Sequence, residues 1–115
     1  MKFINRCVVT LKPKPELIHW VQSLRECEIP EVWDFEGGAY LLDEHETEEA
    51  LLTDIRSKAG IMLENELSVW TEEEEYWPAQ RGYELLEQWF HIHIAVAGFD
   101  MGKGDLLRAD VDSLI

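Results

Sequence analysis

The sequence has no long apolar run, few cysteines and few basic residues, and each shortage narrows the class of protein. No apolar run approaches the roughly 18–20 residues that a membrane-spanning helix needs. Lys12-Pro13-Lys14-Pro15 interrupts the first apolar stretch before the core of a secretion signal is complete, so we expect a cytoplasmic protein. Cys7 and Cys27 lack CxxC spacing, which in that compartment predicts two reduced thiols.

Basic residues are scarce enough to limit the kinds of partner. Ten lysines and arginines stand against 24 aspartates and glutamates, and the formal net charge is −14. Such a surface repels phosphate backbones and anionic lipid, so we expect neither nucleic acid nor a membrane as partner, but rather a basic protein. The excess is concentrated in residues 43–87, where fourteen acidic residues face only Arg56, Lys58 and Arg81.

Signatures of catalysis and of cofactor binding are also missing. The sequence has no nucleophile elbow, P-loop, dinucleotide fingerprint or HExxH motif. No set of residues argues for an enzyme, and none requires a cofactor. We therefore favour a non-enzymatic protein, and the alternative of an enzyme stays open.

The apolar residues that are present, 46% of the chain, suffice for one domain over residues 1–115. Helical spacing predicts a helix that starts at Pro15 and runs to Glu26. The most regular apolar stripe follows a cap at Thr47 and predicts a second helix. Its apolar positions are Leu51, Leu52, Ile55, Ala59, Met62, Leu63 and Leu67. A third helix is predicted to open at Pro78, after an acidic turn in which Thr71 and Glu74 match a capping box.

Period-two alternation predicts the strands. The first covers residues 2–11, with Phe3, Cys7, Val9 and Leu11 on one face. Another covers residues 39–42; the preceding residues 31–38 contain Gly37-Gly38 and form either a hairpin or a loop. The last begins at His91 and ends at Gly98. Asp105 is expected to cap a short helix, and residues 105–115 form a loosely docked tail.

These elements give the order β-α-β-α-α-β plus a C-terminal tail helix. Helices between strands predict an α+β fold, in which a small three- to four-stranded mixed or antiparallel sheet carries helices packed on it. A ferredoxin-like variant is the leading interpretation, because a hairpin at Gly37-Gly38 supplies its fourth strand.

Several motifs together carry a family resemblance. They are Lys12-Pro13-Lys14-Pro15 near the start, residues 63–67 with Trp70, and Trp77-Pro78, Arg81 and Trp89-Phe90 in the second half. Over residues 8–100 the chain resembles a group of small bacterial proteins with a KPKxP start and a WPxxR…WF segment. The resemblance implies one compact domain, and it implies no activity.

His91 and His93 are the leading chemical candidates. Alternation on a strand places both imidazoles on one face, roughly 6–7 Å apart, where they can share a divalent metal ion. A third ligand has to come from elsewhere, and Glu84, Glu87, His19 and His45 are the options. The alternative is a half-exposed sheet face on which each histidine is hydrogen-bonded. A small metal- or ligand-binding protein is therefore the alternative function.

The acidic turn and its aromatic neighbours form the other candidate site. Glu72, Glu73, Glu74 and Glu75 are either a solvated surface or a docking face for a basic protein, as in an inhibitor or immunity protein. Trp70 and Trp77 either belong to the core or line a partner-binding patch. Arg81 either forms an ion pair or anchors an anionic ligand. A homodimer that pairs sheet edges or aromatic patches is a further possibility.

Overall fold

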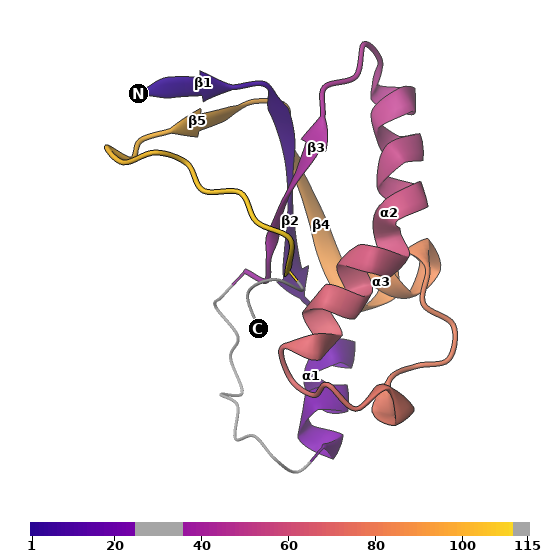
Figure 1. Ribbon diagram of the computed structural model, residues 1–115. Coiled ribbons are helices and arrows are strands. Elements are labelled where there is room, and N and C mark those ends of the chain that lie inside the picture. Colours follow the sequence, from indigo (N-terminus) through magenta and orange to yellow (C-terminus); the bar gives the residue numbers. More distant parts are fainter. Residues whose placement is uncertain (25–35, 112–115) are drawn as a thin grey trace.

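The computed structural model describes residues 1–24 and 36–111, and its central element is strand β2 (Arg6–Pro13). Strands β3 (Ala39–Asp43) and β4 (Phe90–Ala95) flank it in a three-stranded sheet of order β3-β2-β4. Both pairings are antiparallel, with Val9 opposite Tyr40 on one side and Ile94 on the other. The helices α1 (Pro15–Ser23), α2 (Glu48–Ser68) and α3 (Tyr83–Trp89) lie on one side of this sheet (Figure 1).

A second, two-stranded sheet projects from the first as an arm. It pairs β1 (Lys2–Ile4) with β5 (Gly98–Asp100), antiparallel, with Phe3 opposite Phe99. The arm points away from α2 (Figure 1). The single strand predicted over residues 2–11 is therefore two strands interrupted at Asn5, and the alternation that places Phe3 with Cys7, Val9 and Leu11 fails at this break. Phe3 is exposed, whereas the other three are buried.

The core lies between α2 and the inner face of the three-stranded sheet. Thr47 caps α2, because its Oγ1 accepts a hydrogen bond from the backbone N–H of Ala50 at 3.1 Å. The predicted apolar stripe of α2 is buried, with Leu52 only partly so. The sheet contributes Cys7, Val9, Leu11, Leu42 and Phe90 to the same cluster. Alternation on β2 and β4 follows from this one-sided burial.

Two predicted helices are wrong in part. The third helix begins at Tyr83 rather than at Pro78, because the carbonyl of Pro78 accepts a hydrogen bond from Arg81 Nη1 at 2.9 Å and the chain turns there. The tail helix is absent from residues 105–110, which are all exposed. Without a surface to pack against, so short a helix is not stable in water.

The capping box predicted at Thr71 is not formed either. Its Oγ1 accepts from the backbone N–H of Glu73, at 3.1 Å, and the 3₁₀ turn η1 (Glu74–Tyr76) starts after it. The first helix ends at Ser23, with Leu24 as its C-cap, rather than at the predicted Glu26. The first half of the Gly37-Gly38 hairpin and Cys27 lie outside the described residues. The ferredoxin-like order stays a prediction, because its fourth strand falls there too. No helix in the described part of the chain is long and apolar enough to cross a membrane.

Candidate functional site

The acidic turn follows α2 directly and is exposed along its whole length. All four glutamates, Glu72 to Glu75, are exposed. Among residues 1–24 and 36–111, no ion pair involves any of them. The turn therefore presents four carboxylates to solvent without local neutralisation.

Two tryptophans fix the backbone of this turn. The indole Nε1 of Trp20, on α1, donates to the carbonyl of Tyr76 at 3.0 Å. The indole Nε1 of Trp77 donates to the carbonyl of Thr71, also at 3.0 Å. Trp20 in turn packs on Trp89, with ring centroids 5.7 Å apart. The bond from Trp20 thus attaches the end of the turn to α1, and the bond from Trp77 closes the turn on itself.

Arg81 lies beside the turn, and its guanidinium bonds to groups of the same chain. Its Nε donates to Glu64 Oε1 at 3.1 Å, and its Nη1 donates to the carbonyl of Pro78. The guanidinium carbon also lies 5.5 Å from the ring centroid of Trp77. These contacts link the loop before α3 to the exposed side of α2.

His91 and His93 project from the sheet face that is opposite the helices, as their alternation predicts. Both are exposed, and their rings are nearly parallel with centroids 6.3 Å apart. One acidic group lies close to this pair, since Glu36 Oε2 is 3.8 Å from His93 Nδ1. In the described part of the chain, no group of three or more histidine, cysteine, aspartate or glutamate side chains is placed to hold a metal ion. The third ligands suggested by the sequence, at 19, 45, 84 and 87, are thus not brought to this pair.

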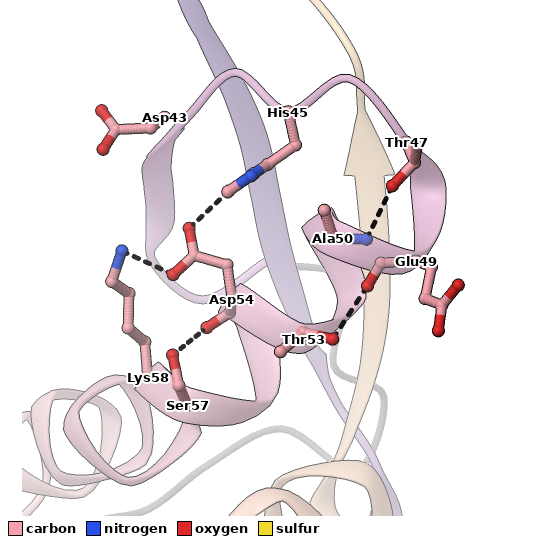
Figure 2. Close-up of a pocket in the computed structure, with 9 residues that line it drawn as sticks. All are labelled: Asp43, His45, Thr47, Glu49, Ala50, Thr53, Asp54, Ser57 and Lys58. Atoms are coloured by element: carbon pink, nitrogen blue, oxygen red, sulfur yellow. Dashed lines mark hydrogen bonds and ion pairs between the residues drawn. The ribbon is translucent and has the colours of Figure 1, made fainter.

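A polar pocket that the sequence did not indicate lies where β3 leads into α2 (Figure 2). His45 Nε2 lies 2.8 Å from Asp54 Oδ2, and Lys58 Nζ lies 2.7 Å from Asp54 Oδ1. Hydrogen bonds from Lys58 and then His45 hold the pKa of Asp54 below its ordinary value. The spacing of four residues between Asp54 and Lys58 is enough to predict a helical ion pair. The contact of His45 with Asp54 cannot be predicted in this way, because His45 lies in the loop before the helix.

Glu66 is the second group that the sequence did not indicate, and it is the one buried charged residue among those described. It is only 6% exposed. Its two carboxylate oxygens each lie 3.1 Å from the backbone nitrogen of Gly38, and Oε2 also accepts from the hydroxyl of Tyr40. Burial, and next the hydrogen bond to Glu66, raise the pKa of Tyr40 above its ordinary value. The one feature of the sequence that indicates a buried Glu66 is its position between Leu63 and Leu67 on the apolar side of α2.

Glu66 also lines a cavity of about 280 Å³. Trp70, Val69, Leu17 and Phe90 form apolar walls around it. Trp70 is half-buried, so of the two predicted site tryptophans it is the one that borders a cavity. Val69 and Trp70 directly precede the turn in sequence, and the cavity and the four glutamates therefore share one end of α2.

Comparison with known proteins gives no relative. No family model matches the chain, and neither does any curated protein or solved structure.

Proposed function

We propose that this protein is a non-enzymatic binding module whose acidic turn, Glu72 to Glu75, engages a basic protein partner. The observation that carries the proposal is a run of four exposed carboxylates on a backbone fixed by the indole groups of Trp20 and Trp77. A neutralising role, of the kind that an inhibitor or immunity protein plays towards a basic effector, fits this chemistry.

Fixation of the turn supports binding because it lowers the entropy lost on association. A mobile acidic loop must be ordered when its partner arrives, and that ordering weakens the complex. Here the carbonyls of Thr71 and Tyr76 already accept indole hydrogen bonds. Backbone hydrogen bonds from Tyr76 to Glu73 and from Trp77 to Glu74, both 3.0 Å, close the turn between them.

Charge supports the same proposal through the rate and the salt dependence of association. Opposite charge steers a partner towards its site and raises the association rate at low ionic strength. Exposed charges are screened beyond a Debye length of about 8–10 Å at physiological salt. A complex formed on this turn therefore weakens as salt is added.

The other acidic cluster of the chain provides a matched control. Glu44, Glu46, Glu48 and Glu49 are also exposed, but they lie around the N-terminal end of α2. The 21 residues of α2 separate the two clusters by about 30 Å. Reversal of either cluster changes the net charge by the same amount, so a difference between the two variants reports position rather than total charge.

The experiment is a pull-down of the tagged protein from nuclease-treated native cytoplasm at low and moderate salt. We expect a stoichiometric basic protein that is lost at moderate salt. Its capture should be abolished by lysine at positions 72–75 and retained with lysine at positions 44, 46, 48 and 49. Equal capture by both variants and the wild type would exclude the acidic turn as the docking face.

We propose self-association through the β1–β5 arm as a second candidate, on a separate observation. Phe3 and Phe99 pack edge to face across the arm, with ring centroids 5.9 Å apart, yet they are 58% and 55% exposed. A two-stranded ribbon is only marginally stable alone. The arm carries no net charge, because Lys2 on β1 lies opposite Asp100 on β5, and this limits the charge repulsion between two acidic copies.

The occupant of the arm is therefore a second copy of the chain. Sedimentation equilibrium should show a dimer for the wild type and a monomer for the double variant Phe3→Ser, Phe99→Ser. A double variant of Val69→Ser and Ile61→Ser, at exposed apolar positions on and after α2, is the control and should stay dimeric. A monomeric wild type would remove this candidate.

A further inference from the structure

Glu66 is a buried carboxylate that, within the described part of the chain, has hydrogen-bond donors but no cation beside it. No lysine, arginine or histidine among the described residues lies within ion-pair distance of it. Removing a carboxylate from water without a counter-charge is unfavourable, and neutral donors offset only part of that penalty. The negative charge of Glu66 therefore stays available to a group that enters the adjoining cavity.

The cavity suits one long side chain rather than a larger ligand. Its volume of about 280 Å³ is below the roughly 300–1,000 Å³ of pockets that take drug-sized molecules or cofactors. Pro13, Leu17 and Phe90 supply apolar wall, against which the methylene stem of a basic side chain can pack. Trp70 adds an aromatic ring, which attracts a cation held close to it.

The hydrogen bonds of Glu66 determine which cation fits. A carboxylate has about four lone-pair sites. Three are directed at Gly38 N–H, which both oxygens share, and at the Tyr40 hydroxyl. No described residue donates to the remaining acceptor site, which is on Oε1. A bidentate guanidinium needs both oxygens, whereas a lysine ammonium needs only one.

We infer that the cavity between α1, α2 and the Gly37-Gly38 segment is a receptor for a lysine side chain of the partner, with Glu66 as its charge partner. This inference rests on the proposed function, since it names the anchor residue that a basic partner inserts beside the acidic turn. Val69 and Trp70 join the two features, because they line the cavity and stand just before Thr71. Exposed Glu36 lines the cavity too and adds to its negative potential.

The test is an NMR titration of the full chain with Nα-acetyl-lysine amide, which carries the proposed group without the rest of a partner. The shifts should centre on the amides of Gly37 and Gly38 and on the Trp70 indole. Nα-acetyl-norleucine amide, which has the stem without the charge, should bind at least about tenfold more weakly. Nα-acetyl-arginine amide should also bind more weakly than the lysine probe. Equal binding of the lysine and norleucine probes would overturn the inference.

Two variants separate the carboxylate from the fold. Glu66→Gln retains an acceptor for Gly38 and Tyr40 but removes the charge, and should weaken lysine-amide binding about tenfold or more. Glu48→Gln, at an exposed position of the same helix outside the lining of the cavity, is the matched control and should change it little. If Glu66→Gln does not fold, Val69→Trp narrows the cavity from a position that is 72% exposed and should abolish binding in a folded protein. Unchanged binding by the folded test variant would refute the assignment.

The inference and the proposed function fail in different ways. If the lysine probe does not bind but charge reversal at Glu72 to Glu75 still abolishes partner capture, the acidic turn works without a lysine receptor. If the probe binds as described but charge reversal leaves capture unchanged, the receptor exists without the acidic docking face.

Discussion

Glu66 and Tyr40 join the long helix to the edge of the sheet through a hydrogen bond between the tyrosine hydroxyl and the carboxylate. The same hydroxyl oxygen lies 3.3 Å from the carbonyl oxygen of Met62 and accepts a hydrogen bond from Asn65 Nδ2 at 2.9 Å. Three residues of α2 thus converge on one side chain of β3. The segment that connects Leu11 to this network is Gly37-Gly38, whose first residue donates its N–H to the Leu11 carbonyl at 2.5 Å.

The first prediction concerns Gly37. A Cβ at this position would lie 2.1 Å from Glu66 Oε1 and 2.9 Å from the Leu11 carbonyl oxygen. Because the second neighbour is backbone, Gly37→Ala requires the segment to move. We expect the free energy of unfolding to fall by about 1–3 kcal/mol. Urea denaturation measures this loss.

Gly82→Ala is the control for that prediction, because a Cβ there meets no atom within 4 Å. Its backbone φ of −144° is one that alanine adopts readily. Because Gly82 is the N-cap of α3, where glycine is preferred to alanine, the loss of stability should be small, at most about 1 kcal/mol. Equal losses in the two variants would mean that the close approach to Glu66 has no special role.

The Glu66 network explains why part of this structure was not readable from the sequence. The sequence predicts either a hairpin or a loop at Gly37-Gly38, because glycine adopts backbone angles that other residues avoid. Their observed role is a close approach to a carboxylate from another element, 28 residues away. Local patterns do not encode such a contact. Helix α2, by contrast, was predicted well, because its cap at Thr47 and its apolar spacing are both local.

The prediction of the sheet was correct where it depended on local alternation, and it was wrong where a strand bends. Alternation placed His91 and His93 on one face correctly, since a strand buried on one side must alternate. Alternation does not show where a strand bends, and the arm formed by β1 and β5 was missed. Because of this bend, Phe3 does not enter the core and instead packs against Phe99. Nothing in the spacing of Phe3, Cys7 and Val9 distinguishes the two outcomes.

The second prediction is a loss of stability at alkaline pH that depends on Tyr40. Its folded-state pKa is raised above the unfolded value of about 10, by burial and then by Glu66. A raised pKa means that the contribution of the neutral hydroxyl is complete below about pH 10 and is lost as pH rises beyond it. The gap in unfolding free energy between wild type and Tyr40→Phe should therefore narrow above that pH. Urea denaturation across alkaline pH measures the gap, and a constant gap would contradict the prediction.

The third prediction concerns Asp54 at acidic pH. Hydrogen bonds from Lys58 and His45 lower its folded-state pKa, so its contribution to stability is complete above the unfolded value of about 4. It is lost as pH falls through the folded value. Asp54→Asn should thus be less stable than wild type near neutral pH, and the two should converge in acid. Glu49→Gln, which lines the same pocket without an ion pair to a described residue, is the control and should track the wild type.

The fourth prediction separates the order of the acidic turn from its charge. Trp20→Phe removes the indole N–H that bonds to the Tyr76 carbonyl but leaves all four glutamates in place. Native-state hydrogen exchange should become faster at the amides of Tyr76 and Trp77, because one attachment of the turn is lost. If a fixed turn lowers the entropy cost of docking, capture of the basic partner should weaken as well, with the salt dependence unchanged. Trp89→Phe keeps an aromatic ring beside Trp20 and is the matched control, since neither of the two indole hydrogen bonds to the turn is donated by Trp89. Faster exchange without weaker capture would mean that the charges alone determine binding.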